Sequence, residues 1–388
     1  MHSGLTDNQL ETLAIEHGTP LLIVDCKKVE QQFASLKTAL PKVDFYYAVK
    51  AFPNAEVVKT LHQCGAGFDV ASTGEIELIR SLYINPRSCI HTHPIKKHAD
   101  IREALRFGCT TFVVDNLDEL KKFKQYRHRV GLLLRVSFRN PNAVVDLSRK
   151  FGCPVEEASA ILMQAKSMGI HVKGLSFHVG SQSGTSDTHV AAINHCASII
   201  SQYNQFANIP MSILNIGGGF PVAYEGSVKN ESGLDIEEFC APIRAAIDNL
   251  NDGIQVIAEP GRFLVAPAAT AVSSVVGKAK RDGKQWYYLD DGVYGNYSGQ
   301  MYDHATYPVR CLKQGTTYSS VLAGPTCDSI DIVREDIQLP DLDIGDLIVG
   351  EVMGAYTAAT ATDFNSLARS KIIILNENSV EQTVFHIA

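Results

Sequence analysis

The sequence lacks the features that mark nucleic-acid-binding, membrane and secreted proteins. It has no long basic block, and its formal net charge of −7 disfavours a nucleic-acid partner. No apolar run reaches the roughly 18 residues that span a bilayer, so we expect no membrane partner. The N-terminal stretch from Met1 to Asp7 has neither a basic region nor an apolar one. We therefore expect no secretory signal.

Cysteine pairs are also missing. The nine cysteines are odd in number and scattered, and none forms a C-x-x-C motif, which argues against a disulfide framework or a zinc knuckle. Reduced thiols are typical of cytosolic proteins, so we expect a cytoplasmic location. His91 and His93 flank a single residue, but no third ligand accompanies them. We expect no metal and favour a structural role for both histidines.

What is present is an ordinary globular composition. Hydrophobic residues make up 45% of the chain and charged residues 20%, which excludes a mainly disordered protein. The length of 388 residues suggests two domains at about 150 residues each, although one barrel can reach about 250. A barrel alone would therefore leave a second domain to explain.

From about residue 20, short apolar strands alternate with amphipathic helices. The strands lack strict apolar–polar alternation, as in a parallel sheet buried on both faces. Eight such strands predict an α/β fold, the (β/α)8 TIM barrel. A doubly wound sheet stays open as the alternative, because a strand count does not show closure. The predicted strands are Phe45–Val49, Gly67–Val70, Cys89–Thr92, Thr111–Val114, Val130–Val136, Lys173–His178, Ile213–Ile216 and Gln255–Ala258.

The pattern changes near Phe263. From there strand-like runs, beginning with Phe263–Lys278, follow one another without long helices, which predicts a mostly β C-terminal domain. We place the barrel at residues 26–265 and the β domain at residues 266–388. Residues 1–25 hold one short helix (Asp7–His17) and an apolar run. They are too few for a domain, and we expect them to pack on the β domain.

Lys50 ends the first predicted barrel strand and is the first candidate for chemistry. Barrel active sites lie at the carboxyl ends of the strands. Desolvation in apolar surroundings would lower the pKa of the Lys50 amine, and a neutral amine can attack a carbonyl carbon. On this segment alone, a lysine that simply reaches into water is the favoured interpretation.

Two loops, after the seventh and eighth strands, could together bind phosphate. Gly217–Gly219 would let backbone N–H groups approach an anion, and Glu259 with Arg262 would offer a carboxylate and a guanidinium. Each signal is weak alone, but the loops would be neighbours in a barrel. His178, at the end of the sixth strand, could lie against an aromatic cofactor or exchange protons, although a lone histidine is more often structural.

The β domain adds two weaker candidates. Cys327 precedes Asp328, and a neighbouring negative charge raises the pKa of a thiol, so this thiol could donate a proton. Tyr356 adds a hydroxyl in a turn of small residues. Neither segment stands out by itself.

Taken together, these segments resemble those of a known enzyme family. They read YYAVKAFPN, GFDVASTGEIELI, LSRKFG, GLSFHVGSQ, LNIGGGFP, AEPGRF, DDGVYG, MYDH, GPTCDSID and GAYTAATATDFN. In this order they are similar to the pyridoxal-phosphate-dependent ornithine/lysine/diaminopimelate decarboxylases, which have the alanine racemase-like fold. The set spans most of the chain and is highly specific. MYDH and GPTCDSID most resemble the bacterial ornithine decarboxylases within the family.

The resemblance implies a cofactor, pyridoxal 5′-phosphate, and a role for each candidate. Lys50 would hold the cofactor covalently, and Cys327 would return a proton to the substrate carbon after carbon dioxide leaves. The implied catalytic residues are Lys50, Cys327 and His178. The implied cofactor contacts are Lys50, Asp69, Glu75, His178, Ser181, Gly218, Gly219, Glu259, Gly261, Arg262 and Tyr356. The implied substrate contacts are Tyr302, Asp303, Cys327, Asp328 and Phe364.

The resemblance also implies a substrate and an assembly. Asp303 and Asp328 would hold the distal ammonium of a diamino acid. Two carboxylates bind a cationic side chain better than an apolar or an acidic one. The expected reaction is therefore decarboxylation of L-ornithine to putrescine, with lysine to cadaverine as a further activity. Cys327 and Asp328 would reach into the site of a partner subunit, so the active unit would be a homodimer.

Rival interpretations stay open at this point. Relatives that act on meso-diaminopimelate usually carry Cys-Glu in place of Cys327 and Asp328. Alanine racemases set an arginine where Glu259 would meet the cofactor. A non-catalytic decarboxylase homologue would tend to lose Lys50, and a lone cofactor-carrying barrel would lack the second domain. The chain departs from its relatives at His91–Pro94, where they usually carry Asn-Pro, and this change would alter the rim of the site.

Overall fold

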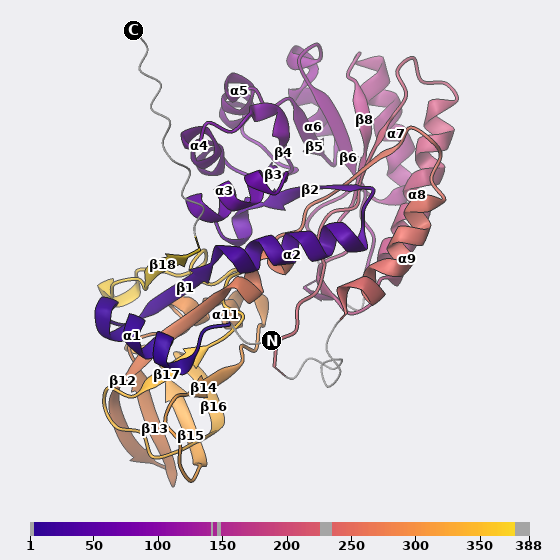
Figure 1. The fold of residues 1–388 in the computed structure, drawn as a ribbon. Coiled ribbons are helices and arrows are strands. Elements are labelled where there is room, and N and C mark those ends of the chain that lie inside the picture. Colours follow the sequence, from indigo (N-terminus) through magenta and orange to yellow (C-terminus); the bar gives the residue numbers. More distant parts are fainter. Residues whose placement is uncertain (1–3, 141–142, 146–148, 226–234, 377–388) are drawn as a thin grey trace.

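The computed structural model describes residues 4–140, 143–145, 149–225 and 235–376 (Figure 1). Eight parallel strands close into a barrel in the order β10-β11-β2-β3-β4-β5-β6-β8. This closure confirms the predicted (β/α)8 barrel and excludes the doubly wound sheet. The barrel strands are β2 (Val43–Ala48), β3 (Gly67–Val70), β4 (Cys89–His91), β5 (Thr111–Val114), β6 (Gly131–Arg135), β8 (Val172–Ser176), β10 (Ile213–Asn215) and β11 (Gln255–Ala258).

Each barrel strand lies between the barrel interior and an outer layer of helices. In β6, for example, Leu132, Leu133 and Leu134 are all buried, because a strand in this position needs apolar side chains on both faces. None of the described helices is long and apolar enough to cross a membrane. The outer helices are α2 (Cys26–Ala39), α3 (Ala55–Gln63), α4 (Thr73–Ser81), α5 (His98–Phe107), α6 (Leu117–Lys122), α7 (Val155–Ser167), α8 (Asp187–Asn204) and α9 (Ile236–Asp248).

The rest of the chain is mostly β sheet, with strands in the order β14-β17-β12-β13-β15-β16. The N-terminal strand β1 (Leu21–Asp25) also belongs to this sheet, since it pairs with β12 and β18. Helix α1 (Asp7–His17) packs there through Leu10, so both ends of the described chain lie on this domain (Figure 1). The strands are β12 (Ala269–Arg281), β13 (Lys284–Leu289), β14 (Val309–Cys311), β15 (Tyr318–Ala323), β16 (Ile332–Leu339), β17 (Leu347–Gly350) and β18 (Lys371–Leu375).

The division of the chain at residues 265 and 266 stays a prediction. The antiparallel pairing of β1 with β12 and its parallel pairing with β18 are consistent with placing the N-terminal segment beside the β domain. Residues 1–3 and 377–388 of the predicted units lie outside the described residues. A separate two-stranded sheet, β7 (Ala143–Val145) with β9 (Ser181–Ser183), interrupts the barrel pattern after β6 and β8.

One predicted strand begins later than expected. The sequence predicts a strand from Phe263, but Arg262–Val265 forms the short helix α10 and β12 begins only at Ala269. The residues after Arg262 are apolar and buried, and a short apolar run cannot distinguish a strand from a buried helix. A second short helix, α11 (Gly299–Asp303), was also not predicted. Both helices present side chains to the barrel mouth.

Candidate active site

One cavity at the carboxyl ends of the barrel strands brings together most of the predicted residues. Its volume is about 390 Å³, which is within the range of small-molecule sites. It is lined by residues at the ends of seven barrel strands or in the loops that follow them, and by two segments that follow β12 in the chain, so both parts of the chain build it. The predicted residues that line it are Lys50, His178, Ser181, Gly218, Gly219, Glu259, Gly261, Arg262, Tyr302, Asp303 and Tyr356.

Lys50 lies in a 3-10 turn directly after β2. The Tyr356 N–H donates to the Ala51 carbonyl oxygen at 3.0 Å, so the later part of the chain holds this turn in place. Lys50 Nζ lies 3.9 Å from Asp69 Oδ2. The two side chains therefore form an ion pair at the edge of the cavity.

The predicted lowering of the Lys50 pKa is wrong. Burial does lower the pKa of this amine, but the negative groups around it, Asp69 first and Glu259 among the others, outweigh burial and raise it. The strand sequence alone does not show these carboxylates, because they come from β3 and from the loop after β11. Lys50 is therefore an ammonium held by its neighbours.

Asp69 and Glu75 stand behind Lys50 and do not line the cavity. Asp69 accepts a hydrogen bond from the Thr92 hydroxyl through Oδ1, whereas its buried Oδ2 has no hydrogen-bond partner among the described residues. Burial raises the pKa of Asp69, and the Lys50 ammonium opposes this shift. Glu75 accepts the Ala71 N–H at 2.5 Å, and burial raises its pKa to about 6.

Glu259 is a partly buried carboxylate on the cavity wall. The Asn215 side chain donates to Glu259 Oε1 at 2.5 Å and accepts the Gly217 N–H at 2.9 Å, which fixes the glycine loop relative to this carboxylate. Burial raises the pKa of Glu259, Asp69 adds to the effect, and Lys50 opposes it. A carboxylate of this kind is stabilised by a cationic or N–H partner in the cavity, such as a protonated ring nitrogen.

Arg262 lines the cavity and binds two hydroxyl groups. Its guanidinium donates to the Tyr224 hydroxyl at 2.9 Å and to the Ser181 hydroxyl at 3.1 Å. The guanidinium lies 4.9 Å from the centre of the Tyr356 ring. It also pairs with Asp303, so Asp303 does reach the cavity, where its predicted contact with substrate stays a prediction. An arginine with hydroxyl donors around it is suited to an oxyanion such as phosphate.

The glycine loop has a backbone that only glycine can adopt. Gly217 and Gly219 have positive φ values of 65° and 102°. A Cβ on Gly218 would lie 2.8 Å from the Glu259 carbonyl oxygen and 3.1 Å from His178 Nε2. Among the described residues, none accepts a hydrogen bond from the N–H of Gly218 or Gly219. These donors are therefore available to an anion in the cavity.

His178 presents an uncharged imidazole to the cavity. The Gly180 N–H donates to His178 Nδ1 at 3.0 Å, so the ring proton lies on Nε2. Burial, followed by the positive charges of Arg135 and Lys50, lowers the pKa of His178 well below its ordinary value. The cavity thus offers anion donors, a flat imidazole, and a lysine with a carboxylate. Together these groups fit an aromatic aldehyde that carries a phosphate and a ring nitrogen.

Nine of the residues that line the cavity were not predicted as site residues, and Arg135, Phe151 and His93 are among them. Arg135 ends β6 and Phe151 follows the β6 loop; the position of Arg135 at the carboxyl end of a predicted strand was the available signal. His93 was expected to be structural, yet it lines the cavity, with its ring edge-on to Phe151 at 5.4 Å. His91 is buried and stacks on Phe112. No cluster of metal-binding side chains is found among the residues the structure describes.

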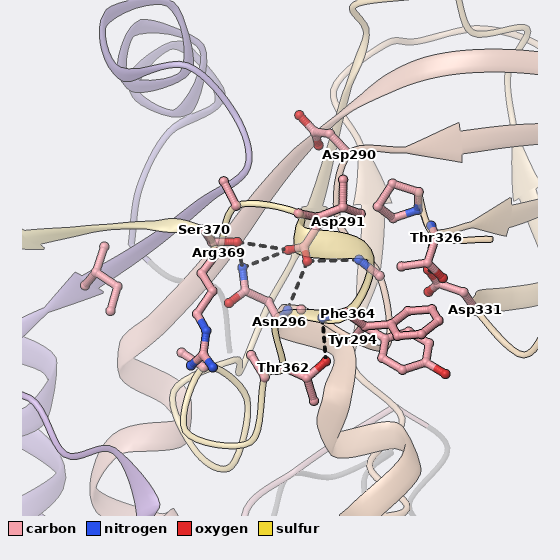
Figure 2. A pocket seen from close by; sticks show the side chains of 18 residues that line it. Asp290, Asp291, Tyr294, Asn296, Thr326, Asp331, Thr362, Phe364, Arg369 and Ser370 are labelled. Carbon is pink, nitrogen blue, oxygen red and sulfur yellow. Dashed lines mark hydrogen bonds between the residues drawn. The ribbon is translucent and has the colours of Figure 1, made fainter. Parts of the chain in front are cut away.

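The remaining predicted residues, Cys327, Asp328 and Phe364, do not line this cavity. They form a second cluster around Tyr294. The Tyr294 hydroxyl donates to Asp328 Oδ2 at 2.5 Å, and the Tyr294 ring stacks on the Phe364 ring with 4.6 Å between the ring centroids (Figure 2). The hydrogen bond from Tyr294 lowers the pKa of Asp328. Cys327 is exposed, and its N–H donates to Asn365 at 2.9 Å.

Asp331 holds the loop that carries Cys327 and Asp328. Its buried carboxylate accepts the Val293 N–H at 2.8 Å, and the Thr326 N–H and hydroxyl at 3.1 and 2.7 Å. Figure 2 shows Asp331 beside Thr326 and close to the paired rings of the second cluster. The loop is therefore braced from inside the domain while Cys327 faces outward. Tyr294 was not predicted as a site residue, although it lies within the DDGVYG motif.

Comparison with known proteins places these features in context. The family model described as "Pyridoxal-dependent decarboxylase, pyridoxal binding domain" matches residues 26–266. The lysine/ornithine decarboxylase of Selenomonas ruminantium is 35% identical over 373 residues, which are 96% of this chain and 94% of the relative. The ornithine decarboxylase of Schizosaccharomyces pombe is 35% identical over 374 residues, covering 92% of this chain and 84% of the relative.

Solved structures agree with these sequence matches. The lysine/ornithine decarboxylase of Vibrio vulnificus, complexed with putrescine, has a TM-score of 0.90 and 48% identity, and the match covers 96% of this chain and 100% of that chain. Its complex with cadaverine gives a TM-score of 0.90 and 49% identity, with 96% of each chain covered.

Replacing Glu259 should change how stability depends on pH. Because the folded-state pKa of Glu259 is raised above its usual value of 4.5, the contribution of this carboxyl to the free energy of unfolding falls as the pH rises above about 4.5. In the cofactor-free protein, Glu259→Gln should therefore lose less stability than the wild type between pH 5 and pH 8, by on the order of 1–3 kcal/mol. Urea unfolding at each pH measures this difference.

The control is Glu335→Gln, which removes an exposed carboxyl on β16. It should follow the wild-type pH profile. Parallel profiles for wild type and Glu259→Gln would contradict the raised pKa.

Proposed function

Because the chain belongs to the pyridoxal-dependent decarboxylase family, we propose that it converts L-ornithine to putrescine and carbon dioxide and also acts on L-lysine. The family predicted from the sequence is confirmed, and with it the assignment as a pyridoxal-phosphate-dependent decarboxylase of basic amino acids. The observation that carries the proposal is the cavity that Lys50, Glu259 and Arg262 line together. The putrescine and cadaverine complexes of the Vibrio relative support both substrates.

The cavity offers a place for each part of the cofactor. Lys50 would hold it covalently, Arg262 and Ser181 would bind its phosphate with the glycine loop, and His178 would lie against its ring. Glu259 would keep the ring nitrogen protonated. Pyridoxal phosphate, when bound, supplies a ring that accepts the electron pair left when the substrate loses its carboxylate.

Substrate recognition depends on carboxylates from both clusters. Asp303 lies at the Arg262 end of the cavity, and Asp328 is kept ionised by the Tyr294 hydrogen bond. Together they would hold the distal ammonium of the substrate. Cys327 would carry a proton on Sγ and return it to the substrate α-carbon, which requires an accessible thiol, and Cys327 is exposed.

A homodimer would bring the two clusters together. Cys327 and Asp328 do not line the cavity of their own chain, while Tyr302 at the cavity and Phe364 in the second cluster are 62% and 42% exposed. Contact with a second copy would cover these aromatic rings and place a thiol in each cavity. A cytoplasmic location is part of the same proposal, supported by nine free thiols.

The rival functions are not favoured. A non-catalytic homologue is disfavoured because Lys50, Glu259 and Cys327 are all present, and the first two share a cavity. A decarboxylase of meso-diaminopimelate would need a cation for the second carboxylate of its substrate. This rival is further disfavoured because the chain carries Cys327 and Asp328 where relatives that act on meso-diaminopimelate usually carry Cys-Glu.

Identification of the amine product tests the proposed function. The purified protein, supplied with pyridoxal phosphate, is incubated separately with L-ornithine, L-lysine, L-arginine and meso-diaminopimelate. We expect putrescine and cadaverine from the first two substrates, no product from the others, and no amine from Lys50→Ala. Release of lysine from meso-diaminopimelate, or full activity in Lys50→Ala, would contradict the proposal.

Removal of the Cys327 thiol tests the proton donor. Cys327→Ala should lower amine release by about 100-fold or more, because a positioned acid contributes on that scale. Binding of pyridoxal phosphate should stay unchanged, since Cys327 lies outside the cofactor cavity of its own chain. Cys64→Ala, which removes a half-buried thiol at the end of α3, is the matched control. Wild-type turnover in Cys327→Ala would exclude the proposed role.

A further inference from the structure

A buried histidine lies directly behind the glycine loop and has no part in the chemistry described above. His189, on helix α8, is 0% exposed, and its Nε2 lies 3.1 Å from the Gly218 carbonyl oxygen. His189 is not among the residues that line the cavity. Any influence it has on a bound molecule is therefore indirect, and its hydrogen bond to the Gly218 carbonyl ties it to the glycine loop.

The proton of His189 is fixed on the nitrogen that faces the loop. A carbonyl oxygen can only accept a hydrogen bond, so Nε2 carries the proton. Burial lowers the pKa of His189 to about 4, and the ring is therefore neutral near pH 7. Its Nδ1 has no hydrogen-bond partner among the described residues. Phe177, Phe220 and Phe239 surround the ring, so the Gly218 contact directs its orientation.

The three glycine carbonyls are each held by a different donor. The Glu259 N–H donates to the Gly217 oxygen at 2.7 Å, and the Ser183 N–H donates to the Gly219 oxygen at 3.1 Å. The Gly218 oxygen receives its hydrogen bond from the His189 side chain, whereas the other two donors are backbone N–H groups. Glycine peptides rotate easily because no Cβ restricts them. Without His189, the central peptide would lose its anchor.

Because a peptide unit is planar, the orientation of the Gly218 carbonyl also sets the orientation of the Gly219 N–H. The peptide between Gly218 and Gly219 is trans, and in a planar trans peptide the carbonyl and the following N–H point in opposite directions. With the Gly218 carbonyl turned toward His189 behind the loop, the Gly219 N–H is turned toward the cavity. That N–H has no acceptor among the described residues.

We propose that His189 is a positioning residue for the cofactor phosphate, which acts by holding the Gly218 carbonyl so that the Gly219 N–H points at the anion. This inference rests on the proposed function, because it assumes that a phosphorylated cofactor occupies the cavity. It assigns to a histidine outside the cavity a contribution to affinity that depends on the phosphate alone.

The test compares two forms of the cofactor that differ only in the phosphate. Dissociation constants for pyridoxal phosphate and for pyridoxal are measured by absorbance titration of the cofactor-free protein, for wild type, His189→Phe and His189→Gln. His189→Phe should weaken pyridoxal phosphate binding about tenfold, the scale of one lost hydrogen bond to a charged ligand site. Its affinity for pyridoxal should be unchanged. His189→Gln, whose amide N–H can reach the same carbonyl, should restore part of the loss.

The control is His195→Phe, which alters an exposed histidine six positions further along α8 and should leave both constants unchanged. Melting temperatures measured in parallel report whether the variants fold, and His189→Leu replaces His189→Phe if the latter does not. Equal weakening for both forms of the cofactor, or no weakening, would overturn the inference. Failure of the wild type itself to bind pyridoxal phosphate would overturn the proposed function, and the inference with it.

Discussion

The ion pair between Lys50 and Asp69 is the interaction on which the rest of the site depends. The closed barrel places the Asp69 carboxylate in a buried position, where one oxygen has no hydrogen-bond partner among the described residues and lies 3.9 Å from the Lys50 ammonium, the largest of the positive charges that act on it. An unpaired buried carboxylate is strongly destabilising, commonly by about 3–5 kcal/mol when one partner of a buried pair is removed. The same negative charge helps to raise the pKa of Glu259. Any molecule that engages Lys50 must therefore bring positive charge or protons to this part of the cavity, and a protonated ring nitrogen beside Glu259 meets that need.

Division of the chemical groups between two clusters explains the architecture of the whole chain. The barrel supplies a lysine, a carboxylate, an imidazole and anion donors, all around one cavity. The later part of the chain supplies a thiol and a carboxylate on a separate exposed loop, which Asp331 braces from within. Neither cluster contains both the group that holds the cofactor and the proposed proton donor. In the proposed homodimer, a single copy of the chain would supply half of two different sites, and this split is the structural reason to expect a partner of the same kind.

Much of the fold could be predicted from the sequence, because a parallel barrel repeats one simple pattern. Eight apolar runs separated by amphipathic helices indicated the strands, and the position of Lys50 at a strand end indicated the cavity. The direction of the Lys50 pKa could not be predicted, because Asp69 and Glu259 approach it from other strands. The short helix that begins at Arg262 was not predicted, because a run of four buried residues is too short to show whether its apolar side chains follow a helical or a strand period.

The candidate site shows the same boundary between local and long-range information. The family motifs named the cavity residues individually, and eleven of them do line one cavity. His93 and His189 carry no local signal of their own, because a lone histidine on a strand or helix is usually structural, and Arg135 has only its place at a strand end. The separation of Cys327 from Lys50 within one chain is likewise a matter of tertiary structure, which no spacing along the sequence expresses.

The most direct test of this account mixes two inactive variants. Lys50→Ala should lack activity because it cannot hold the cofactor, and Cys327→Ala should be severely impaired because it lacks the proton donor. If each site takes Lys50 from one copy and Cys327 from another, random exchange of subunits restores one complete site in each mixed dimer, or roughly a quarter of all sites. The mixture should therefore recover roughly a quarter of the wild-type rate of amine release, and a mixture that stays as inactive as its components would contradict the shared site.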